Sequence, residues 1–212
     1  MKRGASHIVQ TVQRISTHIS AYCQYAGYRS IAGIDEAGRG PLAGPVVAAA
    51  VILPFDYYNP LINDSKQLSK KNREVLYTDI LSHAITYGIG CVSNKQIDRI
   101  NIYQATLKAM KKALHQCSPQ PDFILIDAMP LQSTYPTVSL IKGDQRDMSI
   151  AAASIIAKVT RDRIMYTYHK KYPYYGFITN MGYPTAQHIK ALQEYGSTPI
   201  HRMTFAHVKS LA

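Results

Sequence analysis

The sequence predicts an α/β domain with helical additions at both ends, and three observations support this class. The chain has 212 residues, 46% of them hydrophobic, which is enough to build one substantial core. Apolar runs of strand length alternate with longer segments in which apolar residues recur every three or four positions. No internal repeat and no linker rich in Gly, Ser or Pro divides the chain. These patterns leave the order of the strands open.

The N-terminal residues 1–27 predict an amphipathic helix that ends near Gly27, because their apolar residues recur at steps of three and four. Residues 28–35 and 45–53 are short apolar runs on either side of a glycine-rich turn, so we expect a hairpin. The second run is rich in Val and Ala, which is typical of a strand buried on both faces.

The middle of the chain predicts alternating helices and strands. Ser69 can cap a helix that Gly88 would stop, and a strand follows at 88–93. Asn101 can cap the next helix.

Further strands are expected at 122–128 and 138–142. The helical pattern then returns over 149–168 and 185–195, where Gly196 marks the end. Most helical sequence therefore follows the last strand.

The charge of the chain points to a polyanionic partner. It has 24 Lys and Arg against 13 Asp and Glu, a formal net charge of +11. More than half of this excess lies in residues 150–212, which hold eight basic and two acidic residues. Clustered basic residues gain free energy by displacing counterions from phosphates, so we expect a nucleic-acid partner.

The cysteines and the hydropathy indicate where the protein works. Cys23, Cys91 and Cys117 form no C-x-x-C pair, which argues against a zinc site and a disulfide framework and favours a reducing compartment. No apolar run reaches the length of a membrane span, and polar residues interrupt any signal-peptide core near the N-terminus. We expect a cytoplasmic protein with no membrane contact, and a monomer.

Four carboxylates follow apolar strands. Asp35 and Glu36 end the first run, Asp127 ends the run at 123–126, and Asp144 follows the run at 138–141 after two residues. In open α/β sheets the ligand site lies beyond the carboxyl ends of the strands, so these acids are candidates to converge. Adjacent residues of a regular strand point to opposite faces, so Asp35 and Glu36 share a site only if the strand bends or ends there, which Gly38 favours.

Converging carboxylates require a cation. Several carboxylates within a few ångströms repel each other unless neutralised, and hard oxygen ligands select Mg²⁺ or Mn²⁺. Two such ions about 4 Å apart promote phosphodiester hydrolysis without a nucleophilic side chain. The alternative is that each acid starts a turn or caps a loop, as Asp does in many proteins.

Basic and glycine-rich segments are candidates for substrate contact. In Gly38–Arg39–Gly40 the glycines let backbone N–H groups approach a phosphate that Arg39 can also bind, although a tight turn with a solvated arginine explains the same residues. In the predicted helix at 149–168, three polar residues at i, i+4 and i+7 lie on one side: Ser154, Lys158 and Arg161. This stripe either binds phosphates or is a solvated helix face.

Two other features remain open. Tyr183 lies between Gly182 and Pro184 in a stiff turn, so its ring could stack on a base or sugar, although packing is the default role among sixteen tyrosines. His188, His201 and His207 lack a convincing metal-ligand spacing, and we interpret them as surface or core residues.

Several motifs in order resemble those of the ribonuclease HII family. They are GIDEAGRGPLAGPVVAAAVIL, NDSKQLSKKNRE, ILIDA, IKGD, MSIAAASIIAKVTRD and GYPTAQH, and they run from about residue 28 to the C-terminus. The resemblance implies a catalytic domain at 28–212 with a ribonuclease H-like mixed five-stranded sheet, flanking helices and a helical C-terminal part. Residues 1–27 are then an N-terminal extension.

The resemblance also implies an activity and a set of site residues. The family hydrolyses the RNA strand of RNA–DNA hybrids, cuts on the 5′ side of single ribonucleotides embedded in duplex DNA, and leaves 5′-phosphate and 3′-hydroxyl ends. Asp35, Glu36, Asp127 and Asp144 would be its metal-binding acids. Gly38, Arg39 and Gly40 would contact the 2′-OH and the phosphate, and Tyr183 would stack at the RNA–DNA junction.

Lys66 could bind a phosphate or have a structural role where the chain enters the next helix.

Two alternative functions stay open at this point. A different nuclease of the same broad fold would not need the Gly-Arg-Gly turn, and a non-catalytic hybrid-binding protein would not need the acids.

Overall fold

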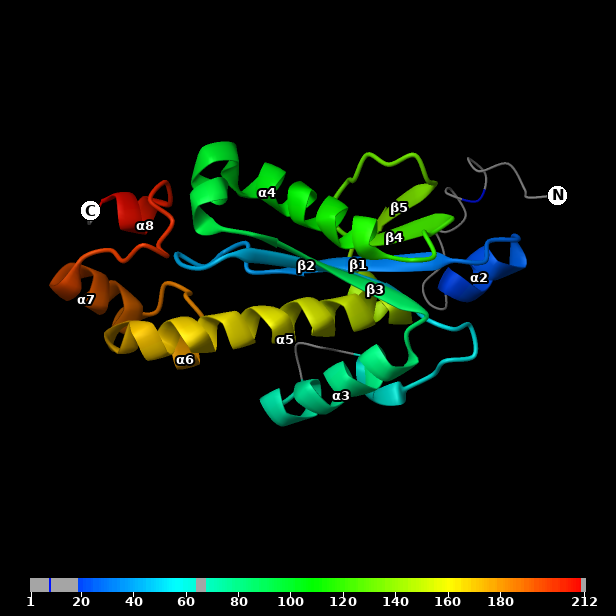
Figure 1. Ribbon diagram of the computed structural model, residues 1–212, viewed down its shortest axis with the longest axis horizontal. Helices are drawn as coiled ribbons and strands as arrows, with labels where there is room; N and C mark the ends of the chain where they lie inside the picture. The colour runs from blue at the N-terminus through cyan, green and yellow to red at the C-terminus, as the bar shows by residue number, and fades with distance from the viewer. Residues whose placement is uncertain (1–7, 9–18, 64–67, 211–212) are drawn as a thin grey trace.

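The computed structural model describes residues 8, 19–63 and 68–210, and it confirms the predicted α/β class. Figure 1 shows a central sheet with helices on both of its faces. Five strands form this sheet in the order β3-β2-β1-β4-β5. Their bounds are β1 Ile31–Ala37, β2 Val46–Ile52, β3 Thr86–Val92, β4 Phe123–Asp127 and β5 Thr137–Leu140.

The sheet is mixed. β1 pairs antiparallel with β2, as the predicted hairpin requires, and β2 pairs antiparallel with β3. β1 also pairs parallel with β4, and β4 pairs parallel with β5. Parallel strands end at the same edge, so the residues that follow β1, β4 and β5 gather on one side of the molecule.

The helices form a layer on each face. α4 packs on β2 and β3 on one face, and α5 packs on β1 and β2 on the other face with α3 beside it (Figure 1). The helix bounds are α2 Ile19–Tyr25, α3 Lys70–His83, α4 Asn94–Gln116, α5 Met148–Lys171, α6 Phe177–Asn180, α7 Ala186–Tyr195 and α8 Ala206–Lys209. Single 3₁₀ turns are η1 Pro60–Asn63, η2 Gly143–Gln145 and η3 Pro173–Tyr175. Among the described residues no helix is long and apolar enough to cross a bilayer.

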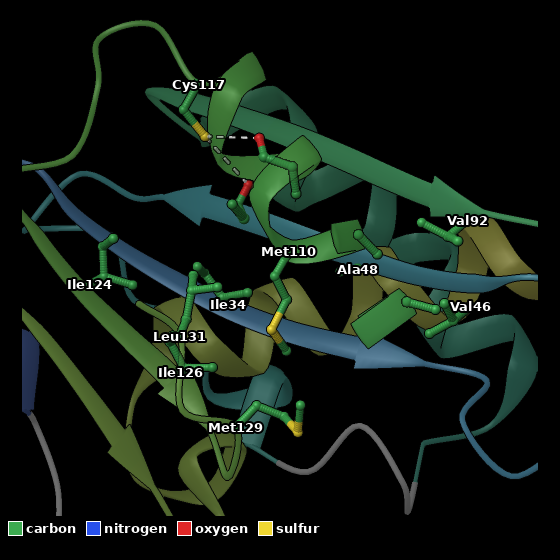
Figure 2. Close-up of a cluster of buried hydrophobic side chains, with 14 of the residues drawn as sticks. Ile34, Val46, Ala48, Val92, Met110, Cys117, Ile124, Ile126, Met129 and Leu131 are labelled. Atoms are coloured by element: carbon green, nitrogen blue, oxygen red, sulfur yellow. Dashed lines mark hydrogen bonds between the residues drawn. The ribbon is translucent and has the colours of Figure 1, made fainter. Parts of the chain in front are cut away.

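Residues of β2 alternate between the two layers. Ala48 and Ala50 belong to the core beneath α4, part of which Figure 2 shows around Met110. Ala49 and Val51 belong to the core shared with α3 and α5. All seven residues of β2 are buried, as expected for a strand covered on both faces.

α5 lies unusually close to the sheet. A Cβ at Gly33 of β1 would lie 2.1 Å from the carbonyl carbon of Ser149, so only glycine permits this approach. The small residues Ala151, Ala152 and Ala153 continue the contact and are buried. This packing places the first turn of α5 against β1, and the helix reaches the end of the strand further along, where Gly38 meets Arg161.

Local signals predicted most helix ends correctly. Ser69 caps α3 by accepting a hydrogen bond from the Asn72 N–H at 3.2 Å. α3 nevertheless ends at His83, so the predicted stop at Gly88 is wrong. Gly88 lies in β3, where a Cβ would meet the Ala113 carbonyl oxygen of α4 at 2.0 Å.

α4 begins earlier than predicted, after Ser93. Asn101 interrupts it with a φ of 63° and caps the second part by accepting from the Gln104 N–H at 3.0 Å. The predicted cap at Asn101 is therefore present within a longer helical segment.

The last predicted helix is confirmed, with Thr185 as its N-cap and Gly196 at its end. At the other end of the chain, α2 carries the final turns of the predicted N-terminal helix. Apart from Ile8, residues 1–18 of that helix lie outside the described residues.

Candidate functional site

Asp35 and Asp127 lie side by side at the end of the parallel pair β1 and β4. Ile34 pairs with Ile126 in register, so the two aspartates are the next residues on neighbouring strands. Asp35 shares the α5 face with Ala49, its partner on β2. Asp127 lies on the same face, because Ile126 before it points into the opposite core beneath α4. The predicted convergence of these two acids is therefore present.

Asp144 reaches the same edge through η2. The backbone N–H of Gly143 donates to Asp127 Oδ1 at 2.7 Å, and a Cβ at Gly143 would lie 3.4 Å from the Asp127 Cα. Asp144 follows directly and is 1% exposed. The turn that carries Asp144 is thus fixed against Asp127, which lies on β4, the strand next to the one that carries Asp35.

Glu36 is placed differently from the other three acids. β1 continues through Ala37 in regular pairing with β2, so the strand does not end at Asp35 and Glu36, and the condition under which these two acids would share one face is not met. Glu36 pairs with Ala48 and points toward the α4 face, where Arg39 Nη1 lies 3.4 Å from its Oε1. Asp35 and Asp127 therefore share a face, Asp144 lies in the turn fixed against Asp127, and Glu36 points toward the other face.

The acids interact electrostatically. Burial raises the pKa of Asp35 well above its usual range, and the charges of Glu36 and Asp127 raise it further. Hydrogen bonds from Ser154 and from the Glu36 N–H, the latter at 2.7 Å, oppose this rise. A buried carboxylate among like charges is stabilised by a cation, and an all-carboxylate donor set suits a hard divalent ion.

The donor set thus fits Mg²⁺ or Mn²⁺ by its chemistry. Within the described part of the chain, however, no group of three or more His, Cys, Asp or Glu side chains already stands in an arrangement that could hold a metal ion. Backbone N–H groups hold Asp35 and Asp127 in their present rotamers.

The Gly-Arg-Gly turn follows β1. Gly38 has a φ of 95°, and a Cβ there would lie 2.0 Å from Arg161 Nε, so glycine is required by a buried arginine beneath it. Arg39 and Gly40 are exposed at the tip. Gly40 faces Tyr183, whose Cε1 would lie 3.4 Å from a Cβ at that position. The turn and the tyrosine, far apart in sequence, form one surface.

Two buried histidines hold Tyr183 from behind. His201 Nδ1 accepts from the Thr198 N–H at 2.8 Å, so its proton lies on Nε2, which is 2.9 Å from His188 Nε2. His188 then donates from Nδ1 to the Tyr183 carbonyl at 2.9 Å. Burial lowers the pKa of both histidines, and lowers that of His201 to about 4 together with the neighbouring His188. His188 and His201 are therefore core residues, one of the two roles expected for them.

The predicted phosphate stripe on α5 is largely wrong. Arg161 is 1% exposed and donates to the carbonyls of Ala43, Pro45 and Met181, so its guanidinium faces the interior. Ser154 is also buried and bonds to Asp35. The third member, Lys158, is partly exposed, with Nζ 2.7 Å from Asp162 Oδ1.

Lys66 lies outside the described residues.

Sequence reasoning missed Arg202, a fully buried residue whose guanidinium binds the backbone of the Gly-Arg-Gly turn. No periodic pattern marks Arg202, because it acts on a segment that is distant in sequence.

Comparison with known proteins agrees with this arrangement. The family model described as Ribonuclease HII matches residues 32–208. Ribonuclease HII of Listeria monocytogenes serotype 4a (strain HCC23) is 52% identical over 221 residues, covering 98% of this chain and 85% of that protein. Ribonuclease HII of Geobacillus sp. (strain WCH70) is 58% identical over 185 residues, covering 87% and 67%.

Solved structures share the fold. The ribonuclease H2 from Pyrococcus horikoshii OT3 superimposes with a TM-score of 0.74 at 28% identity, covering 86% of this chain and 97% of that one. The RNase HII in a PCNA complex from Archaeoglobus fulgidus gives a TM-score of 0.69 at 26% identity, covering 85% and 96%.

Proposed function

The chain belongs to the ribonuclease HII family, and from this premise we propose that Asp35, Glu36, Asp127 and Asp144 hold two divalent cations, Mg²⁺ or Mn²⁺. Membership makes it a metal-dependent endonuclease of the ribonuclease H type. It hydrolyses the RNA strand of RNA–DNA hybrids and cuts on the 5′ side of ribonucleotides embedded in duplex DNA. The observation that carries the proposed site is the side-by-side placement of Asp35 and Asp127, with the turn before Asp144 bonded to Asp127.

The two ions would supply Lewis acidity, which lowers the pKa of the attacking water and neutralises charge on the leaving oxygen. The protein supplies the anionic site and its rigidity. β1 and β4 fix the spacing of Asp35 and Asp127, and the Gly143 N–H orients the carboxylate of Asp127. The close contact between Gly33 and α5 keeps Ser154 in reach of Asp35.

Substrate recognition is assigned to the surface next to the acids. Gly38, Arg39 and Gly40 contact the 2′-OH and the phosphate of the ribonucleotide, since the 2′-OH is the group that distinguishes RNA from DNA. The half-exposed ring of Tyr183, 45% accessible and beside Gly40, stacks at the RNA–DNA junction.

Basic side chains complete the proposed contact. Lys158 and Lys66 bind the backbone of the nucleic acid without sequence preference. Arg161 and Ser154 take no direct part in this binding.

The organisation of the chain is part of the proposal. Residues 28–212 form the catalytic domain and residues 1–27 an N-terminal extension, in agreement with a family match that begins at residue 32. We propose that the enzyme acts as a monomer in the cytoplasm, where its nucleic-acid substrates lie.

A cleavage assay tests the metal site. The substrate is duplex DNA with one embedded ribonucleotide, incubated with Mg²⁺, Mn²⁺ or EDTA, and an all-DNA duplex serves as the substrate control. The native chain should cut 5′ of the ribonucleotide in metal and not in EDTA, and Asp35→Asn should lose this activity. Glu194→Gln, an exposed acid on α7, is the matched variant and should cut normally. Equal cleavage by Asp35→Asn and the native chain would contradict the site.

A further inference from the structure

Arg202 connects the C-terminal part of the chain to the loop between β1 and β2. Its backbone N–H donates to the Leu42 carbonyl at 2.8 Å, and the Gly44 N–H donates to the Ile200 carbonyl at 2.9 Å. Ala43 and His201 form the β-bridge between these hydrogen bonds. The side chain of Arg202 is thereby directed under the Gly-Arg-Gly turn, where it is fully buried.

The guanidinium of Arg202 binds backbone carbonyls. Nη2 donates to Gly38 at 2.6 Å, Nη1 donates to Arg39 at 2.8 Å, and Nε donates to Gly44 at 3.0 Å. A guanidinium is planar and carries five N–H donors in a fixed fork, so one side chain can fix several peptides at once. Burial lowers the pKa of Arg202 to about 9, with a further contribution from the charge of Arg161, and the group is still protonated at neutral pH.

These bonds determine where the N–H groups of the turn point. In a planar trans peptide the C=O and the next N–H point in opposite directions. Holding the Gly38 and Arg39 carbonyls inward therefore turns the N–H groups of Arg39 and Gly40 outward. Both residues are exposed, and neither N–H donates to a backbone carbonyl within residues 19–63 and 68–210.

We propose that Arg202 is the positioning residue of the ribonucleotide-sensing turn: it holds two peptides from below so that their N–H groups face the 2′-OH and phosphate of the substrate. Arg202 does not touch the substrate. This inference rests on the proposed function of the turn, and it assigns the orientation of the sensing donors to a residue of the C-terminal segment.

Arg161 provides an internal comparison. It is buried to the same degree and also binds only backbone carbonyls, those of Ala43, Pro45 and Met181. It does not bind the carbonyls of Gly38 and Arg39. Loss of either guanidinium removes buried hydrogen bonds, but only loss of Arg202 frees the two peptides of the turn.

The test compares Arg202→Lys, Arg161→Lys and Arg163→Lys with the native chain. Lysine keeps the positive charge but cannot reach several carbonyls in one plane. Arg163 is exposed on α5 and paired with Glu74, so its variant controls for the loss of an arginine as such. The dissociation constants for duplex DNA with one ribonucleotide and for the all-DNA duplex are measured without divalent metal, which separates recognition from hydrolysis. Thermal melting shows that each variant is folded at the temperature used.

We expect Arg202→Lys to lose roughly tenfold of the preference for the ribonucleotide duplex, which is the order of magnitude expected when one or two hydrogen-bond donors are misaligned. Its affinity for the all-DNA duplex should change little. Arg161→Lys should lose less of the preference, and Arg163→Lys none. An unchanged preference in folded Arg202→Lys, or an equal loss in Arg161→Lys, would overturn the inference. If the native chain shows no preference in binding and no cleavage, the proposed function itself fails, and the inference fails with it.

Discussion

The buried pair His188 and His201 should make the stability of the protein depend on pH below neutrality. Protonation of His201 would place a second proton on Nδ1, which faces the donating N–H of Thr198. The neutral form is therefore favoured in the folded state. The pKa of His201 is therefore lower in the folded protein than in the unfolded chain. Between these two pKa values the folded protein binds fewer protons than the unfolded chain, so its stability falls as the pH falls.

The size of this effect follows from the pKa of His201, which is lowered from 6.5 to about 4. Each pKa unit corresponds to about 1.4 kcal/mol, so full protonation costs about 3 kcal/mol of folding free energy. At pH 7 and above His201 is mostly neutral in both the folded and the unfolded protein, so little of this stability is lost. Between pH 7 and about pH 4.5 the free energy of unfolding should decrease by about 2 kcal/mol through this group.

Urea denaturation at these two pH values measures the effect. His201→Gln is the comparison, because glutamine can accept from Thr198 and donate to His188 but does not titrate. Carboxylates that titrate in this range affect both proteins, so the difference between their two pH dependences reports His201 together with its coupling to His188. If acidification destabilises both proteins equally, within about 0.5 kcal/mol, the assignment of the neutral histidine is refuted.

Three further outcomes are expected. Asp127→Asn should reduce cleavage at least about a hundredfold, because it removes a proposed metal ligand. It should not lower the melting temperature, because it also removes charge repulsion with Asp35. A clear loss of stability would contradict this electrostatic account. Gly38→Ala should lower the free energy of unfolding by about 2–4 kcal/mol, because the new Cβ would meet Arg161 and the backbone φ at this position is 95°. A change below about 0.5 kcal/mol in denaturant unfolding would argue against that contact. Tyr183→Ala should raise KM roughly tenfold while Tyr183→Phe keeps it, and equal effects of both substitutions would exclude stacking.

Much of the fold could be predicted because its signals are local. Ser69 and Thr185 cap helices with hydrogen bonds to residues three positions ahead. The hairpin of β1 and β2 follows from two apolar runs and a turn. The parallel pairing of β1 with β4 joins segments about ninety residues apart, and no local pattern specifies it.

In the site, too, residues marked by a local sequence pattern could be predicted, and residues that act through distant contacts could not. Asp35 and Asp127 were found because each ends an apolar run, and strand alternation places them on one face. Arg161 was misassigned because a basic residue on a helix was expected to face solvent, whereas α5 is covered on most sides. Arg202 binds the distant backbone of the Gly-Arg-Gly turn, and His201 contacts the side chain of His188, so the roles of both residues depend on tertiary contacts.

The hydrogen bond from Arg202 to Gly38 spans 164 residues of sequence and sets an order of events during synthesis. The turn leaves the ribosome early, followed by the strands that carry the acids, while Arg202 emerges long afterwards. If Arg202 positions the turn as proposed, selectivity for a ribonucleotide requires the C-terminal segment, which is synthesised last.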